Sequence, residues 1–176
     1  EKIAEKAAGA ISEFYQIPMR HAGGSEALLK SGRQIGVEKY LVCSVATIPQ
    51  QVPAINDFIL GECAQHPEFI GFGAMHPGYE DIGGELRRIK ALGLRGVKLH
   101  PDFQQFYIDD DAALPMFRAI RDNDMFLLIH LGDDKRLAAG GLEQAAGFLD
   151  VLAVAHERDC AVVVVELSGL HDVSAI

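Results

Sequence analysis

Imidazole, ammonium and carboxylate side chains come at the ends of short apolar segments in this 176-residue chain. His76 follows one such segment, Lys98 and His100 end the next, His130 ends a third and Glu166 lies near the end of a fourth. Imidazole nitrogens and carboxylates on neighbouring elements can bind one divalent cation. The same groups can act as general acid and base near neutral pH. The residue types therefore indicate acid–base or metal-assisted chemistry, provided that the fold brings them to one place.

Five short segments, dense in apolar and β-branched residues, predict buried strands over residues 40–46, 69–75, 95–100, 125–130 and 161–167. Apolar residues spaced by three and four predict helices between them, over residues 52–65, 86–92, 114–120 and 142–156. Two further helical stretches, 2–14 and 25–35, precede the first strand. The acidic residues 109–111 are suited to capping the helix over 114–120, and Pro115 fits its first turn.

Strand and helix segments alternate along the chain. The strands begin 29, 26, 30 and 36 residues apart, close to the about 30 residues of one βαβ unit. Because parallel strands require crossover helices, this order predicts a parallel sheet, either open and doubly wound or closed as a (β/α)8 barrel. The GxGxxG sequence of a dinucleotide-binding sheet is absent. A complete barrel needs about 250 residues. We therefore expect a single α/β domain over residues 1–176 that is an incomplete barrel of the TIM type.

Functional residues of parallel α/β folds lie at the carboxyl ends of the strands, so one rim should hold these polar side chains. Lys98 alternates with Val97 and Leu99, and we expect it to point inward with His100 while its apolar neighbours face the helices. An inward Lys is costly unless it is paired or functional, and pairing with Glu166 is the structural alternative. Three aromatic residues after this strand predict either a pocket wall or a packed loop: Phe103, Phe106 and Tyr107.

Composition restricts the classes of function. The chain carries 25 acidic and 16 basic residues, a formal net charge of −9, which argues against a general nucleic-acid binder. No apolar run approaches the roughly 20 residues that span a bilayer, and the first residues are charged rather than signal-like. Three cysteines, odd in number and far apart, predict buried reduced thiols and a cytoplasmic protein. Neither a GxSxG nucleophile motif nor a Walker loop is present.

Four stretches of the sequence carry a resemblance to a known family. They read GFGAMHP at residues 71–77, GLRGVKLHPDFQ at 93–104, IDD at 108–110 and FLLIHLGD at 126–133. Together they resemble the amidohydrolase superfamily, most closely the branch of metal-dependent TIM-barrel hydrolases that also contains aminocarboxymuconate-semialdehyde decarboxylase and related nonoxidative decarboxylases. The resemblance covers residues 35–135 well and the remainder loosely.

The resemblance implies a (β/α)8 barrel that holds a divalent metal ion, commonly zinc. In this family the metal is bound by an HxH pair on the first strand, a His on the fifth and an Asp on the eighth, and a His on the sixth acts in catalysis. The five predicted strands correspond to the second to the sixth. His130 then matches the fifth-strand metal ligand, and Lys98 and His100 match the fourth-strand rim, where a catalytic role is implied.

The chain departs from this family pattern in several places. It contains no HxH pair and no counterpart of the eighth-strand Asp, so we expect a fragment of the barrel with one of the four metal ligands. Glu166 stands where relatives carry the sixth-strand His, which makes it the third catalytic candidate. His76 and Asp133, after two of the matching strands, are the expected substrate-binding residues.

The implied function is that of a metal-dependent hydrolase, which attacks an amide, ester or lactone-like bond of a small organic substrate through a metal-activated water. A nonoxidative decarboxylase of the same family is the first alternative. A degenerate barrel used for binding or assembly is the second, and a metal-free aldolase or isomerase that uses Lys98 is the third. The expected partner is a small molecule rather than nucleic acid or a membrane, and association into a homo-oligomer is left open.

Overall fold

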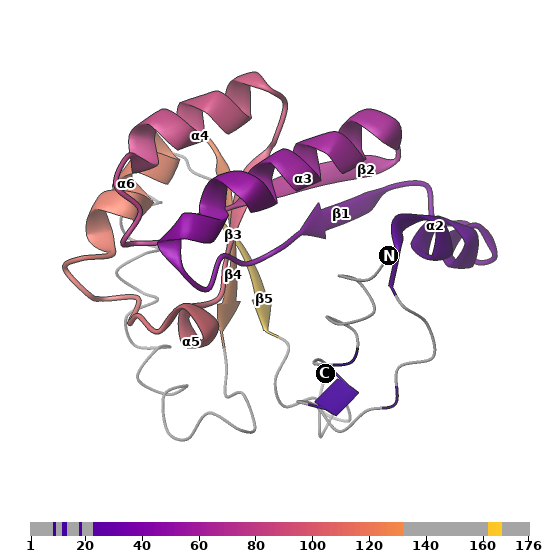
Figure 1. Cartoon of the computed structure of the whole chain (residues 1–176), viewed down its shortest axis with the longest axis horizontal. Helices are drawn as coiled ribbons and strands as arrows, with labels where there is room; N and C mark the ends of the chain where they lie inside the picture. The colour runs from indigo at the N-terminus through magenta and orange to yellow at the C-terminus, as the bar shows by residue number, and fades with distance from the viewer. Residues whose placement is uncertain (1–8, 10–11, 14–17, 19–22, 132–161, 167–176) are drawn as a thin grey trace. The chain divides into compact units, whose positions relative to one another are not determined.

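The computed structural model describes residues 9, 12–13, 18, 23–131 and 162–166 (Figure 1). The chain divides into two compact units, Glu1–Tyr40 and Leu41–Ile176. The first unit contains helix α2 (Ser25–Arg33), in which Leu29 is buried. Its basic residues lie in the last turn, where their positive charge interacts favourably with the negative end of the helix dipole. This confirms the predicted helix over 25–35, whereas the helices predicted over 2–14 and 142–156 lie mostly or wholly outside the described residues.

The strands form one sheet in the spatial order β1-β2-β3-β4-β5. Each strand falls on one of the five predicted segments: β1 (Tyr40–Cys43), β2 (Phe69–Ala74), β3 (Gly96–Leu99), β4 (Phe126–Leu131) and β5 (Val162–Glu166). From β2 to β5, successive strands pair in parallel. A doubly wound sheet reverses its strand order at a switch point, whereas a barrel adds strands in chain order. The observed order therefore confirms an α/β fold of the (β/α)8 type, with part of the barrel present.

Three helices of the second unit pack against the sheet: α3 (Val52–Gln65), α4 (Ile82–Ala91) and α6 (Leu114–Asp122) (Figure 1). Their apolar side chains share one buried core with Val97, Leu99 and Ile129 of the strands. Two glycines of β2 let the helices pack closely against this strand. A Cβ at Gly71 would lie 2.7 Å from the sulfur of Cys63 on α3, and a Cβ at Gly73 would lie 2.8 Å from Ile89 on α4.

Several local predictions are corrected by the structure. Helix α4 begins earlier than residue 86, because Asp81 caps it by accepting a hydrogen bond from the Gly84 amide at 2.9 Å. The acidic residues 109–111 do not cap α6. The N-cap of α6 is Ala113, and Asp110 instead accepts a hydrogen bond from the amide of Tyr107 at 2.8 Å. Two short helices were not predicted, the 3-10 helix η1 (Pro49–Gln51) and helix α5 (Pro101–Gln104).

The described cysteines, Cys43 and Cys63, are both free thiols, as predicted, but Cys43 is exposed and Cys63 is only half-buried. The expectation of buried thiols is therefore wrong for Cys43.

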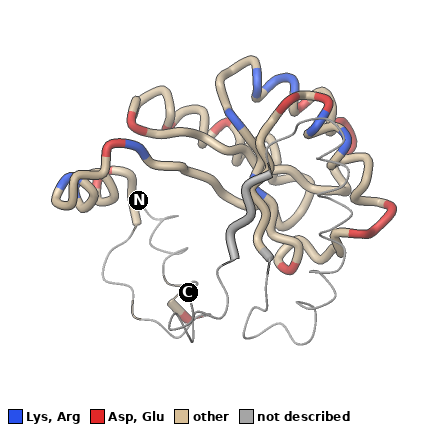
Figure 2. Tube along the Cα trace, turned by 180° about the vertical axis from the view of Figure 1, so that it is seen from behind, with Lys and Arg blue, Asp and Glu red and all other residues tan. Residues whose placement is uncertain are grey.

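Lys and Arg are interspersed with Asp and Glu along the described chain (Figure 2). None of the helices in the described ranges has the length and apolar content that a membrane span requires.

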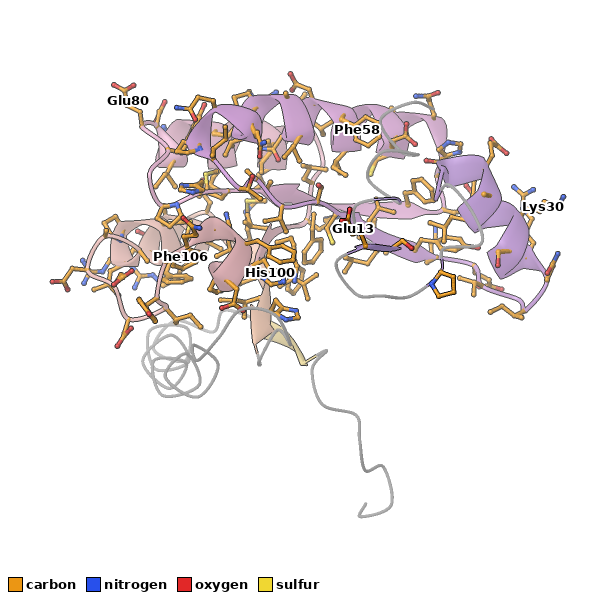
Figure 3. All side chains as sticks on the ribbon, turned by 60° about the horizontal axis from the view of Figure 1, so that its bottom comes forward. Glu13, Lys30, Phe58, Glu80, His100 and Phe106 are labelled. Carbon is orange, nitrogen blue, oxygen red and sulfur yellow. The ribbon has the colours of Figure 1, made fainter. Side chains whose placement is uncertain are left out.

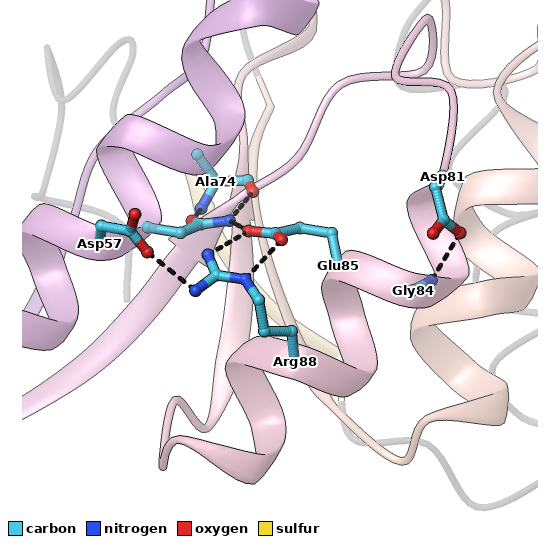
Figure 4. A network of polar contacts seen from close by, with 7 residues as sticks. Asp57, Ala74, Asp81, Gly84, Glu85 and Arg88 are labelled. Atoms are coloured by element: carbon cyan, nitrogen blue, oxygen red, sulfur yellow. Dashed lines mark hydrogen bonds and ion pairs between the residues drawn. The ribbon is translucent and has the colours of Figure 1, made fainter.

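A buried polar network joins α3, β2 and α4 (Figure 4). Asn56 is fully buried, and its Oδ1 accepts a hydrogen bond from the Ala74 amide at 2.7 Å. Its Nδ2 donates to the Ala74 carbonyl at 3.2 Å and to Glu85 at 2.7 Å. Arg88 donates to both oxygens of Glu85, at 2.7 and 2.8 Å, and forms an ion pair with Asp57 at 2.8 Å. The amide of Asn56 thus bonds both backbone groups of Ala74 and fixes the carboxyl end of β2 against the helices.

Candidate metal and substrate site

The two faces of the sheet have different surroundings. In the strand register Val97 lies beside Gly73, which faces α3 and α4, so Val97 lies on the helix-covered face. Lys98 lies beside Ala74 and Leu128 on the opposite face. The predicted alternation at β3 is therefore confirmed. Along β4 the same alternation places His130 on the face of Leu128 and hence of Lys98.

His100, which is labelled in Figure 3, directly follows β3, and its ring contacts that of His130 near the carboxyl end of β4. Their rings are stacked with centroids 4.0 Å apart and planes inclined by 11°. The ring of Phe103, on α5, also stacks on His100, with a centroid distance of 3.9 Å and an angle of 6°. Both His side chains are buried, with 6% and 7% exposure. Phe103 thus belongs to the site, whereas Phe106 packs against Phe117 at 6.4 Å.

A carboxylate joins these two imidazoles. One donor atom each of His100, Asp102 and His130 lie within 4.8 Å of one another. Three donors at about 2.1 Å from a tetrahedral ion lie about 3.4 Å from one another. The donor atoms would therefore approach one another by up to about 1.4 Å on binding an ion, and the stacked rings would turn, because an imidazole nitrogen binds a metal in the plane of its ring. Two imidazoles and a carboxylate are a donor set that zinc and manganese accept. Asp102 was not among the predicted site residues.

The protonation state of His100 also suits a role in binding a metal ion. Burial, reinforced by the charges of His130 and Lys98, lowers the pKa of His100 to about 3. At neutral pH the ring is therefore uncharged, and a neutral imidazole is the form that binds metals. Its Nδ1 atom is buried and has no hydrogen-bond partner among the described residues. A buried acceptor without a partner is costly, and a bound cation would satisfy it. The residues present therefore fit a divalent metal.

Lys98 is a buried amine on the same face as this donor group. It is 9% exposed and forms no hydrogen bond or ion pair within the part of the chain that the structure describes. Burial lowers its pKa, while the nearby thiol of Cys43 acts in the opposite direction. The backbone of Glu166 pairs with Leu131, next to His130, so Glu166 ends β5 at the same rim. Its side chain lies outside what is described, and so does any pairing with Lys98.

The remaining predicted residues are not part of this group. His76 follows β2, and its Nδ1 accepts a hydrogen bond from the Gly78 amide at 3.0 Å. Burial lowers its pKa, so the ring is neutral at neutral pH and carries its proton on Nε2, where it can donate. Asp133 lies outside the described residues. The structure therefore brings together His100 and His130, with Lys98 on the same face, and adds Asp102.

A family model described as Amidohydrolase matches residues 5–170, so the chain belongs to the amidohydrolase family. Solved structures show the same fold. 5-Carboxyvanillate decarboxylase LigW from Sphingomonas paucimobilis is 20% identical, with a TM-score of 0.61 over 78% of this chain and 49% of the other. A probable 2-pyrone-4,6-dicarboxylic acid hydrolase from Acinetobacter baumannii is 14% identical, with a TM-score of 0.52 over 79% of this chain and 46% of the other.

A further similar structure contains a metal. It is 5-carboxyvanillate decarboxylase LigW2 from Novosphingobium aromaticivorans, with bound manganese and 3-methoxy-4-hydroxy-5-nitrobenzoic acid. It is 19% identical, with a TM-score of 0.64 over 87% of this chain and 54% of that one. The chain spans about half the length of these three proteins. No protein with a curated description matches the chain.

Proposed function

We propose that the protein is a metal-dependent enzyme that decarboxylates or hydrolyses a small organic carboxylate. The observation that carries this proposal is the donor group of His100, Asp102 and His130 with the amine of Lys98 on the same sheet face. A cation held by the three donors would act as a Lewis acid toward a substrate oxygen. Zinc suits the donor set, and manganese is the alternative because the LigW2 structure contains it.

Lys98 is the residue that would recognise the substrate's charge. A buried cation without an ion pair is unfavourable, and a carboxylate beside it offsets that cost. Phe103 and the aliphatic neighbours of Lys98, Ala74 and Leu128, make the surroundings apolar. In such surroundings a charged hydrogen bond is stronger than in water. An anionic, ring-containing substrate is the best match to this combination.

Nonoxidative decarboxylation is the reaction that we favour, because two of the three similar structures described above are decarboxylases. Hydrolysis is the second candidate, favoured by the Acinetobacter structure. The two reactions are distinguished by supplying the zinc- or manganese-loaded protein with 5-carboxyvanillate and with 2-pyrone-4,6-dicarboxylate. Decarboxylation of the first compound releases CO2, whereas hydrolysis of the second does not. The proposed substrate class is wrong if neither compound is bound or converted.

The other predicted roles complete the proposal. Glu166 would serve as a general acid or base at the rim, and His76 and Asp133 would contact the substrate. His100 would be a metal ligand rather than the catalytic residue that the resemblance implied. A cytoplasmic location and association into a homo-oligomer remain parts of the proposal.

Substitution of Lys98 by Met is expected to weaken binding of 3-methoxy-4-hydroxy-5-nitrobenzoate about 10- to 100-fold, because it removes a charged hydrogen-bond donor and keeps the aliphatic chain. Binding is followed by the change in absorbance of the nitrophenol. Lys98→Arg should restore part of the affinity. The control is Lys90→Met, which alters an exposed Lys on α4 and should change nothing. Equal affinity in Lys98→Met and the unmodified protein would exclude Lys98 as the carboxylate contact.

A further inference from the structure

Gln104, the last residue of α5, is a buried amide at the rim of the sheet, with 3% exposure. Its Nε2 donates to the carbonyl of Ala46 at 2.9 Å and to the carbonyl of Met75 at 2.6 Å. Its Oε1 accepts from the amide of His100 at 2.8 Å. The three partners belong to the segments that directly follow β1, β2 and β3. One side chain therefore ties together the carboxyl ends of three strands.

The partners determine how the amide is oriented. Two are carbonyls, which need donors, and one is an N–H group, which needs an acceptor. A flipped amide would place its oxygen against two carbonyl oxygens and its NH2 group against an amide hydrogen. Only one orientation of the Gln104 amide satisfies all three partners.

The same side chain holds the residues that carry the donor group. The backbone amide of Gln104 donates to the carbonyl of His100 at 3.0 Å, so the two residues are joined in both directions. Between them lie Asp102, which supplies the carboxylate, and Phe103, which stacks on His100. A helix of four residues has too few internal hydrogen bonds to be stable alone. The contacts of Gln104 supply what α5 lacks.

We propose that Gln104 is a positioning residue: it anchors α5 to three strand ends so that His100 and Asp102 face His130. Its importance for activity rests on the proposed function. Its effect on the geometry of His100 does not, and can be measured in the metal-free protein. Asn56 provides a matched control, because it is also a fully buried amide that binds backbone groups at the end of β2, but from the helix-covered side.

The test compares Gln104→Met with Asn56→Leu by NMR of the histidine rings in the metal-free protein. Ring currents of Phe103 and His130 should displace the His100 proton signals upfield, and His100→Gln assigns them. In Gln104→Met these signals should move toward those of the unstacked rings, while Asn56→Leu keeps the displacement. If Gln104→Met does not fold, Gln104→Glu keeps the shape but turns a carboxylate oxygen toward two carbonyls, and the same loss is expected.

A second measurement addresses the metal. The dissociation constant for Co²⁺, followed by its visible absorption, should rise about 10- to 100-fold in Gln104→Met and less than about threefold in Asn56→Leu. Unchanged His100 signals in Gln104→Met, or an equal loss in both variants, would overturn the inference. Absence of Co²⁺ binding by the unmodified protein would instead overturn the proposed metal site, and the NMR comparison would still decide the role of Gln104.

Discussion

Replacement of His130 by Ala is expected to remove most of the bound divalent metal and to lower kcat/KM at least about 100-fold. Changes to groups that merely orient metal ligands cost about 10- to 100-fold in affinity or activity, and loss of a ligand costs more. His130 lies in β4, which pairs with β3 on one side and β5 on the other, so the backbone should persist without the imidazole. Metal content after dialysis, measured by mass spectrometry, and steady-state kinetics provide the readouts.

The matched control for His130 is His66→Ala. His66 is the C-cap of α3, has a partly exposed side chain 3.9 Å from Glu62, and is not in the donor group. The His66→Ala variant should keep its bound metal and its activity. If His130→Ala retains one metal per chain and full activity, His130 is not a ligand and the proposed site is wrong.

Substitution of Asn56 by Leu is expected to lower the free energy of unfolding by about 3 kcal/mol and the Tm by roughly 6–12 °C. Leu has a similar size but no polar atoms. It would leave the amide and carbonyl of Ala74 and one bond of the buried Glu85 unsatisfied. Each buried polar group that loses its partner costs about 1–3 kcal/mol. Urea denaturation followed by circular dichroism measures the change.

Asp57→Ala is the control for this substitution, because it changes the next residue and the same network. Asp57 pairs with Arg88 at 2.8 Å, but its side chain is 64% exposed. An exposed ion pair contributes about 0–1 kcal/mol, so the control should lower stability by less than about 1 kcal/mol. A loss below 1 kcal/mol in Asn56→Leu as well would show that the network does not hold β2 in place.

The sequence was sufficient to predict the strands. Short, β-branched segments such as 162–166 are typical of parallel strands that are buried on both faces, and their spacing indicates crossover helices. The starts of α2, α3 and α6 fall on the predicted residues, whereas the start of α4 was missed. Gly83 and Gly84 interrupt the apolar period at the start of α4, while the cap at Asp81 carries no periodic signal. Helix α5, with four residues, is too short for any periodicity to reveal it.

The part of the candidate site that lies on strands was predicted, because strands follow simple rules of alternation. Alternation along β3 and β4 places Lys98 and His130 on one face, and the strand-end rule brings His100 near them. Asp102 and Gln104 lie on α5, and Gln104 anchors this helix through hydrogen bonds to Ala46 and Met75, which are far away in the chain. An acidic residue two positions after a strand-end His was the available signal for Asp102.

Anomalous diffraction from crystals grown with Mn²⁺ or Zn²⁺ tests the central claim most directly, because it locates the ion itself. We predict one strong peak in contact with nitrogen atoms of His100 and His130 and a carboxylate oxygen of Asp102, at about 2.0–2.2 Å from each. A fourth ligand from elsewhere in the protein would agree with this prediction. A peak that touches none of the three residues, or no peak under conditions in which the enzyme is active, would contradict it.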